Sequence, residues 1–515
     1  MRSPLACAGL LVAALASGLA APAAPPAGDA RRGRQIYLRG AGSSGDVLAS
    51  LGDGATEVPA SVLPCASCHG HDGEGRPEGG VAPSAITWER LTKPYGMEQE
   101  GGRSHPPYSE ESLARAITEG LDPAGNRFQV AMPRYRMSRA DLADLIAFLH
   151  RLGRDTDPGV GEGQLVLGTF VPRQGPQAAI GETMRAVLAA QLERVNSEGG
   201  VYGRRLELRV LRPEQGAAAL EGIFALVGGL PGAQGMDLAA LAEEHEVPLV
   251  APVILDPQPS SPPGRFVFYL LSGLREQALA LASFAGQTIP TRELRALIVH
   301  PDLPRARELA KALEQRGKDS GWAEVKAYAY GAGSLRPKLL ATAGQRSGCN
   351  AVFFLGSADE AKVFVRAAAR LRFAPHVFVE GSLAGRGIVD LPREFAGPVY
   401  VAFPARPLPP ASEERRELEH LVAPLGLPAE HEAFQAWAYT AGRILLEALH
   451  SAGSRLDRER FVSALEGLYD FDAGAPAPIR FGPERRVGAA GATVAQVDGG
   501  ARRLVPVRAW VSADP

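Results

Sequence analysis

The sequence predicts a multidomain protein in which a small all-α domain precedes a larger α/β domain folded as two lobes. The first observation is length, because 515 residues exceed the size of one ordinary domain. The second is a set of helical apolar stripes within residues 28–153, around a Cys-x-x-Cys-His pentapeptide. The third is the alternation of short apolar runs with longer amphipathic segments throughout residues 163–515.

The composition restricts the possible partners. Hydrophobic residues make up 45% of the chain, charged residues make up 22%, and the formal net charge is −2. A nearly balanced charge provides no bulk attraction to nucleic acid or to an anionic membrane surface. We therefore expect no nucleic-acid partner. Beyond the N-terminal segment, no stretch reads as long and apolar enough to span a bilayer.

Residues 1–23 are predicted to be a signal peptide. Arg2 supplies the positive start, an apolar run follows, and small residues near Ala20 and Ala23 offer a cleavage site. The mature chain is then expected in the periplasm. A lipid anchor on Cys7 is the alternative, and the charged region before this cysteine is short for one.

The pentapeptide Cys65-Ala66-Ser67-Cys68-His69 carries the most specific chemistry of the chain. Two thiols at this spacing can each add across a vinyl group of haem, and the histidine then binds the iron. One such motif predicts one covalent haem c, attached at Cys65 and Cys68 with His69 as an axial ligand. A zinc half-site or a redox-active thiol pair is the alternative, and the export signal argues against both.

An electron carrier needs a sixth iron ligand that stays bound in both oxidation states. Met132 is the candidate, because it precedes Pro133 and a final helix that Ser138 is expected to cap. Its thioether would raise the potential by favouring Fe(II). Met137 is the rival ligand. The remaining alternatives are His71, His105 and His150.

Residues 28–153 as a whole resemble class I cytochrome c. The resemblance rests on the haem-attachment pentapeptide and on the pattern Met-Pro-x-Tyr-x-x-x-x-x-Asp-Leu that begins at Met132 and leads into a helix. It implies an all-α electron carrier. The sequence departs from the family in the long polar segment 40–64, which lies between the first helix and the haem motif.

Residues 154–162 are predicted to be a linker, because they are polar and include Asp-Pro-Gly. The strand candidates beyond it are 165–170, 206–211, 223–227, 248–251, 294–299, 351–355, 376–379 and 399–403. The helix candidates between them include 180–197, 236–244, 305–316 and 359–371. Repeated strand–helix units predict parallel sheets covered by helices on both faces, and about 350 residues require two of them.

This second domain resembles the type I periplasmic binding proteins of the branched-chain amino-acid class. The resemblance rests on a Gly-Pro loop before a long helix, on Asn-Ser-Glu-Gly-Gly-Val-Tyr-Gly-Arg at 196–204, and on the late helix 434–449. It implies a periplasmic-binding-protein fold in which three crossings join two lobes that close on a ligand. The resemblance places lobe 1 at about 163–275 and 403–478, and lobe 2 at about 276–402 and 479–510.

In such a fold the ligand lies at loops that leave the carboxyl ends of the strands. The candidate cleft residues are Arg173, Gln174, Gly229, Leu230, Pro252, His300 and Glu380. Amino-acid-binding members of the family hold the ligand carboxylate with hydroxyl residues and backbone amides in the loop that follows the strand at 223–227. This chain has Gly-Gly-Leu-Pro-Gly there, at 228–232. The tyrosine that the family has soon after the strand ending at residue 299 is replaced here by His-Pro-Asp at 300–302. Glu380 can pair with a ligand cation. These departures predict a small organic solute, less polar than leucine, isoleucine or valine, or aromatic.

The sequence therefore predicts a periplasmic electron carrier with a fused solute-binding domain. The haem would take electrons from a periplasmic dehydrogenase and pass them to another cytochrome or a terminal oxidase. The alternative is a substrate-binding protein that delivers a small solute to an ABC importer and carries an accessory haem. A third reading is catalysis by the haem iron. Methionine-ligated iron has no open coordination position, so we expect no enzyme and no catalytic residues.

Overall fold

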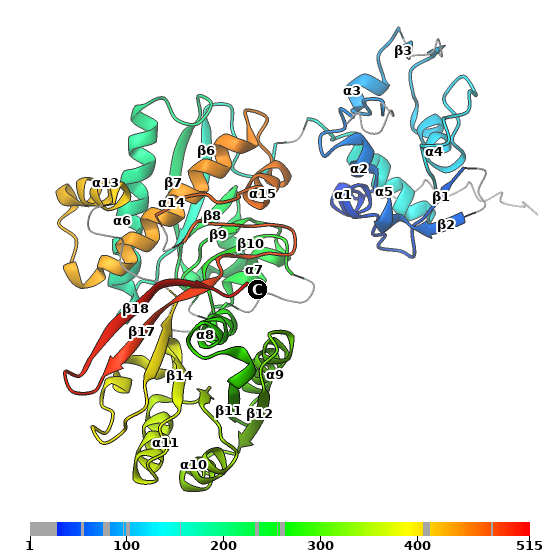
Figure 1. Ribbon diagram of the computed structural model, residues 1–515. Coiled ribbons are helices and arrows are strands. Elements are labelled where there is room, and N and C mark those ends of the chain that lie inside the picture. Colours follow the sequence, from blue (N-terminus) through cyan, green and yellow to red (C-terminus); the bar gives the residue numbers. More distant parts are fainter. Residues whose placement is uncertain are drawn as a thin grey trace, which may run out of the picture. The chain divides into compact units, whose positions relative to one another are not determined.

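A computed structural model gives the structure of the chain (Figure 1). It describes residues 28–52, 56–75, 83–95, 97–98, 104–154, 156–231, 236–254, 256–257, 263–404, 412–474 and 477–514. The predicted signal peptide lies outside these ranges. The chain divides into two compact units, Met1–Asp155 and Thr156–Pro515, and we describe each by itself. Within the described residues, no helix combines the length and the apolar character that a membrane span requires.

The first unit is built around helices, as predicted. They are α1 (Ala30–Arg39), α2 (Cys65–His69), α3 (Trp88–Leu91), α4 (Glu110–Glu119) and α5 (Arg139–Leu149). Ser138 caps α5 by accepting the backbone N–H of Asp141 at 3.0 Å, which confirms the predicted start of that helix. Leu145 and Leu149 lie on the buried side of α5.

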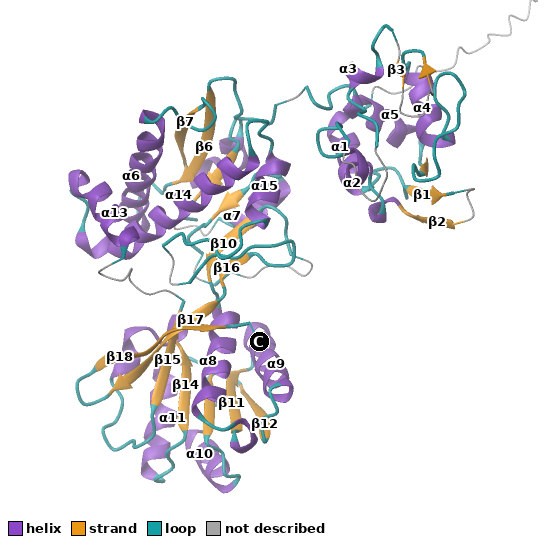
Figure 2. Ribbon diagram, turned by 45° about the horizontal axis from the view of Figure 1, so that its top comes forward, coloured by secondary structure: helices purple, strands orange, loops and turns teal. Residues whose placement is uncertain are grey.

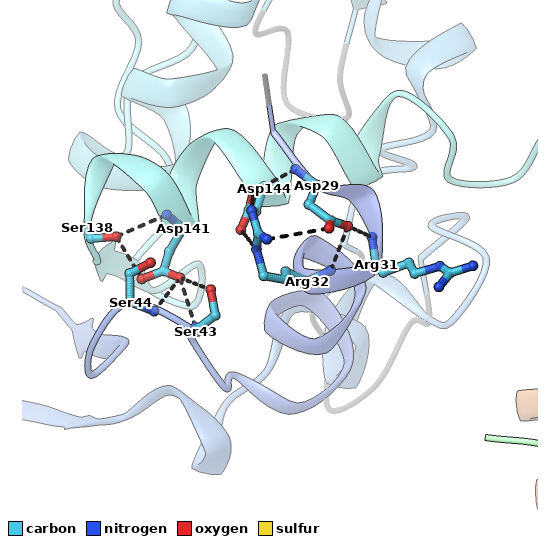
Figure 3. A network of polar contacts seen from close by, with 8 residues as sticks. All are labelled: Asp29, Arg31, Arg32, Ser43, Ser44, Ser138, Asp141 and Asp144. Atoms are coloured by element: carbon cyan, nitrogen blue, oxygen red, sulfur yellow. Dashed lines mark hydrogen bonds and ion pairs between the residues drawn. The ribbon is translucent and has the colours of Figure 1, made fainter. Parts of the chain in front are cut away.

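Helices α1 and α5 pack together at a glycine. A Cβ on Gly33 would lie 1.9 Å from the carbonyl oxygen of Asp144, so no other residue fits there without backbone movement. The buried Asp144 carboxylate accepts Arg32 Nε at 2.6 Å and the backbone N–H of Asp29 at 2.6 Å (Figure 3). The Arg32 hydrogen bond, despite an opposing effect of burial, lowers the pKa of Asp144. The first and last helices are thereby fixed to each other.

The polar segment before the haem motif forms strands, which the all-α prediction did not include. Strand β1 (Leu48–Leu51) pairs antiparallel with β2 (Thr56–Pro59) on one side and with β5 (Arg134–Arg136) on the other. The 3-10 turn η1 (Ala60–Val62) then leads toward α2. A second pair joins β3 (Met97–Glu98) to β4 (Ser104–His105). The first sheet links the segment before the pentapeptide to the segment that follows Met132.

Lobe 1 of the second unit is a six-stranded parallel sheet in the order β16-β10-β9-β8-β6-β7. Its strands are β6 (Gln164–Phe170), β7 (Arg205–Leu211), β8 (Ala225–Val227), β9 (Leu249–Val250), β10 (Val267–Leu271) and β16 (Val487–Ala489). Its helices are α6 (Pro176–Ser197), α7 (Leu238–Glu244), α13 (Glu413–Val422), α14 (Glu432–Ala452) and α15 (Arg458–Glu466). Short 3-10 turns are η2 (Pro213–Leu220), η5 (Ala423–Leu425) and η6 (Ala429–His431).

Lobe 2 is a seven-stranded sheet in the order β12-β11-β13-β14-β15-β17-β18, parallel up to β15 and antiparallel beyond it. Its strands are β11 (Arg295–Pro301), β12 (Glu324–Tyr330), β13 (Ala351–Phe354), β14 (His376–Glu380), β15 (Val399–Phe403), β17 (Gly491–Asp498) and β18 (Arg503–Ser512). Its helices are α8 (Leu274–Thr288), α9 (Pro304–Asp319), α10 (Pro337–Arg346), α11 (Ala358–Arg370) and α12 (Gly381–Ala384). Its 3-10 turns are η3 (Thr291–Glu293) and η4 (Gly385–Val389).

The central parallel strands of both sheets are buried on both faces under helices, whereas the edge strand β18 is mostly exposed (Figure 2). In β13, Phe353 belongs to the apolar core on the side of α8 and α9, whereas Phe354 belongs to the core beneath α10 and α11. In β6, Leu167 and Phe170 likewise lie in different cores. Strands covered on both faces read as continuous apolar runs, which is how the sequence predicted them. The predicted two-lobed α/β fold is confirmed.

The chain crosses between the lobes from β10 to α8, from β15 to α13 and from β16 to β17. The last crossing lies later in the chain than predicted. The sequence places residues 479–489 in lobe 2, and the structure places them in lobe 1. Val487 in β16 pairs instead with Tyr269 in β10, and Ile479 and Phe481 lie in the lobe 1 core. The chain leaves lobe 1 only after Ala489.

The predicted linker is also shorter than residues 154–162. Asp157 accepts the backbone N–H of Arg458 at 2.5 Å, and Val160 is buried in the core of lobe 1. Arg458 is itself buried and donates its guanidinium to the carbonyl oxygens of Ile223 and Phe224, just before β8. Residues from Asp157 onward are therefore part of lobe 1.

Candidate haem site and solute cleft

The predicted attachment residues form the single turn α2. Pro64 precedes the turn and Gly70, with a φ of 75°, ends it. Residues three apart on a helical turn lie on the same side, so both thiols face one direction. Cys65 is half-buried and Cys68 is exposed, and both are free thiols. A planar cofactor held by thioether bonds at both positions fits this arrangement.

His69 is held in the tautomer that an iron ligand requires. Its side chain is only 7% exposed, and Nδ1 lies 2.9 Å from the carbonyl oxygen of Ser84. A carbonyl oxygen only accepts, so Nδ1 carries the proton and Nε2 keeps its lone pair. Burial lowers the pKa of His69, and the Ser84 carbonyl opposes this effect in part. A neutral imidazole with an available Nε2 fits haem iron.

Two buried tyrosines hold the backbone on either side of α2. The hydroxyl of Tyr37 in α1 donates to the carbonyl oxygen of Gly70 at 2.7 Å. The hydroxyl of Tyr135 in β5 donates to the carbonyl oxygen of Leu63 at 2.7 Å. The ends of the predicted attachment segment are therefore fixed by elements far away in the sequence, which sequence reasoning did not identify.

The Cys65 thiol lies in an apolar environment. Burial raises its pKa to about 11, although the neighbouring Tyr135 hydroxyl lowers it in part. A thiol with so high a pKa stays protonated at neutral pH and is a poor thiolate for redox exchange or zinc. The environment suits a buried thioether better than the alternative redox pair.

Met132 is half-buried at the edge of the first unit's core, two residues before β5. Met137, which follows β5, packs against the same core. Two of the alternative histidines have partners elsewhere: His105 Nδ1 lies 2.9 Å from Pro106 O, and His150 Nε2 lies 2.9 Å from Glu110 Oε1. His150 also stacks on Trp88, with ring centroids 3.5 Å apart.

The predicted cleft residues all lie at or just beyond the carboxyl ends of parallel strands. Arg173 and Gln174, after β6, are exposed, whereas Gly229, Leu230 and Pro252, after β8 and β9, are buried. His300, at the end of β11, and Glu380, at the end of β14, are at most 5% exposed. The loops are therefore where the resemblance implied.

A cavity of about 330 Å³ nevertheless has other residues in its wall. It lies where the chain crosses between lobes, and its lining comes from the segments after β9, β10, β14 and β15 and from α14. The lining residues are Ile254, Asp256, Leu271, Ser272, Leu274, Ser382, Leu383, Pro404 and Trp437. None of the seven predicted cleft residues is among them. Trp437 lies in α14, which contains the late helix 434–449 of the family resemblance. Its contribution to the cavity depends on how the two lobes meet.

Glu380 is a fully buried carboxyl group beside this cavity wall. Neither of its oxygens has a hydrogen-bond partner among the described residues. Burial raises the pKa of Glu380 well above its usual value, and Asp256 and Glu276 raise it further while Arg305 opposes them. Arg305 Nη2 donates to Asp256 Oδ1 at 3.1 Å. A group that is buried and unpaired in this way typically belongs to a functional site.

The family comparisons agree with both parts of the structure. A cytochrome c family model matches residues 61–153, and a periplasmic binding protein model matches residues 164–501. The chain is 22% identical over 307 residues to Leu/Ile/Val-binding protein homolog 1 of Brucella abortus, covering 57% of this chain and 80% of that protein. It is also 22% identical over 311 residues to Leu/Ile/Val-binding protein BraC3 of Rhizobium johnstonii, covering 59% and 83%.

Solved structures show the same fold. A putative branched-chain amino acid ABC transporter from Rhodospirillum rubrum superposes with a TM-score of 0.52 at 18% identity, covering 67% of this chain and all of that one. This identity supports the fold of the second unit and nothing finer. The family model of that unit matches more than half of the chain. The chain therefore belongs to the periplasmic binding protein family and carries a cytochrome c domain ahead of its binding domain.

Proposed function

We propose that this chain is a periplasmic electron carrier with a single covalent haem c and a fused solute-binding domain. The observation that carries the proposal is the turn α2, in which two thiols share one side and His69 presents a neutral imidazole. Cys65 and Cys68 would form the thioether bonds, and His69 and Met132 would bind the iron. Haem supplies a one-electron couple between Fe(III) and Fe(II).

The protein's own groups fix the position of this couple. Ser84 sets the ring orientation of His69, and the hydroxyls of Tyr37 and Tyr135 hold the backbone before and after the attachment turn. Because these hydrogen bonds are buried, the segment loses little order when the charge at the iron changes. Such rigidity keeps the reorganisation that accompanies electron transfer small.

The binding domain would couple this electron carrier to a small organic solute. In the leading version the domain docks a periplasmic dehydrogenase or senses its substrate, and the haem passes electrons on to another cytochrome or a terminal oxidase. The ordinary branched-chain amino acids are poor candidates for the solute, because the loop at Gly228 and Gly229 lacks hydroxyl side chains.

Transport is the second candidate function. It is favoured by the match to the binding-protein family and by relatives named Leu/Ile/Val-binding proteins. In this version the cleft captures a solute for an ABC importer and the haem is accessory. Hydrogen exchange on the complex with a partner separates the two: a redox partner would protect the region of Cys68, whereas an importer would protect surfaces of both lobes.

Native mass spectrometry on protein purified from a periplasm without dialysis tests the proposal. We expect the mass of one haem and of a small co-purified solute. Replacing Cys65 and Cys68 with Ser should abolish the haem mass, and Cys349→Ser, a buried thiol in lobe 2, is the matched control. A chain without covalent haem would refute the electron-carrier proposal. A haem-loaded chain with an empty cleft would favour a docking role for the binding domain.

A further inference from the structure

We propose that the cavity between the lobes binds a small apolar molecule whose polar end is a hydrogen-bond donor, an alcohol or an amine, and which carries no carboxylate. The inference rests on the proposed solute-binding function and specifies its ligand. Four features support it: the apolar wall, the wall donors that already donate within the protein, the acidic Asp256 in the wall, and the loop after β8, which lacks hydroxyl side chains.

Most of the cavity wall is apolar. Aliphatic side chains and an indole enclose the space, and its volume of about 330 Å³ lies at the lower end for small-molecule sites. The apolar members are Ile254, Leu271, Leu274, Leu383, Pro404 and Trp437. Burying a hydrocarbon or aromatic body against them would supply the bulk of the binding free energy.

The side-chain donors in the wall already donate within the protein. Trp437 Nε1 donates to Ala251 O at 3.0 Å, and Ser272 Oγ donates to Gly491 O at 2.5 Å. Ser382 Oγ donates to Gln277 Oε1 at 3.2 Å and accepts from Gln277 Nε2 at 3.0 Å. What these hydroxyls offer a ligand is therefore lone pairs, and the Asp256 carboxylate is an acceptor as well. Within the wall itself, the polar end of a ligand therefore pairs best if it brings the hydrogen.

The surrounding charge disfavours a carboxylate. Asp256 lines the cavity, and Asp256 and Glu276 both act on the neighbouring Glu380, where Arg305 is the opposing charge. Arg305 already pairs with Asp256 at 3.1 Å and with Glu308 at 3.7 Å. A ligand carboxylate would face Asp256 in the wall, while Arg305, the described cation beside it, is already paired through Nη1 and Nη2, which is costly in a buried site.

The loop after β8, where amino-acid-binding members of the family hold the ligand carboxylate, offers no hydroxyl group for one in this chain. Its backbone N–H groups at Gly228 and Leu230 donate to Val250 O at 2.8 Å and to Phe170 O at 3.0 Å. Its sequence has no serine or threonine. The hydroxyls that would hold a carboxylate are therefore absent from this loop, and its amides at Gly228 and Leu230 are in use.

Two matched ligand series test the inference by calorimetry on the full-length, haem-loaded chain after its bound solute has been dialysed away. One series is isoamyl alcohol, isoamylamine, isovalerate and leucine, and the other is benzyl alcohol, benzylamine, benzoate and phenylglycine. Each series keeps the apolar body nearly constant and changes the polar end. We expect an alcohol or amine to bind about tenfold or more tightly than the carboxylates, since a mispaired buried charge costs at least that factor.

A variant reverses the chemistry of the wall. Leu383 is 37% exposed, so Leu383→Arg is expected to fold while adding a donor and a positive charge to the cavity. It should weaken binding of the alcohol or amine and strengthen binding of isovalerate or benzoate. Leu339→Arg, at an exposed position on α10, is the control and should change neither.

Three results would overturn the inference. One is binding of leucine or of either monocarboxylate as tightly as the matched donor. Another is absence of binding by every alcohol and amine in a chain whose haem spectrum and thermal unfolding are normal. The third is an unchanged preference in Leu383→Arg. None of these results would touch the electron-carrier proposal, which fails if no haem is attached.

Discussion

The haem site and the solute cavity differ in how their residues are distributed along the chain. Three of the four proposed haem-binding residues lie within Cys65–His69, and the polar supports come from Tyr37, Tyr135 and Ser84. The cavity takes its lining from several strand ends and from α14, and no short motif contributes most of it. The proposed haem site is therefore local in the sequence, whereas the cavity is assembled from both lobes.

The two regions also differ in how their buried polar groups are satisfied. Around α2, the hydroxyls of both tyrosines and Nδ1 of His69 all have backbone partners. Beside the cavity, both oxygens of Glu380 and Nε of Arg305 are buried without a partner among the described residues. Complete pairing suits a site that must not move, and missing pairs suit a site that a ligand completes.

The largest expected effect is on the haem side. Met132→Ala should lower the midpoint potential by on the order of 0.1 V, because the thioether favours Fe(II). Spectroelectrochemical titration measures this directly. Met137→Ala, at the other methionine on the same core, should leave the potential within error of the parent chain. If the two variants behave in the opposite way, Met137 is the ligand.

A smaller effect is expected at the tyrosines that hold the attachment turn. Tyr135→Phe leaves the carbonyl of Leu63 without its buried partner and should cost about 1–2 kcal/mol in the first unit. Tyr37→Phe should act similarly at Gly70. Chemical unfolding followed by haem absorbance reports the cost, and a shifted potential would show that the bond also positions the iron ligands.

Tyr202→Phe provides the comparison for this pair. The Tyr202 hydroxyl donates to His450 O at 2.6 Å, but its side chain is half-exposed and water can replace the bond. Its loss should therefore change the stability of the second unit by less than about 0.5 kcal/mol. Equal costs at Tyr135 and Tyr202 would contradict the view that the haem segment depends on buried pairing.

The same contrast explains what could be predicted from the sequence. The pentapeptide and the strand–helix repeat are local patterns, so the haem motif and the two-lobed fold were accessible. Strand β1 was not, because its four residues, Leu-Ala-Ser-Leu, lack β-branched or aromatic side chains and become a strand only by pairing with β2 and β5. Ser84 was not either, since it lies 15 residues beyond His69 in a segment without a pattern.

In the binding domain, the strand ends were predicted, but none of the seven residues singled out for the cleft lines the cavity. Parallel strands are readable one at a time, so Glu380 was correctly placed at the end of a strand. Ser272 and Leu274 belong to a crossing between the lobes, and a crossing has no apolar period of its own. Their role follows from the meeting of two sheets, which is information that no single segment of the sequence contains.

The last prediction tests the unpaired side of the comparison. Burial raises the folded-state pKa of Glu380 above its ordinary value of 4.5, so its favourable contribution is complete below that value and is lost as the pH rises through the folded pKa. Glu380→Gln removes this dependence. We expect the variant's second unit to match the parent at acidic pH and to exceed it by about 1 kcal/mol at mildly alkaline pH, measured by circular dichroism during urea unfolding. Glu394→Gln, at an exposed position in lobe 2, is the control. A variant that is less stable than the parent at alkaline pH would mean that the carboxylate has a partner in solution, and the cavity would then resemble the haem site in being complete before any ligand arrives.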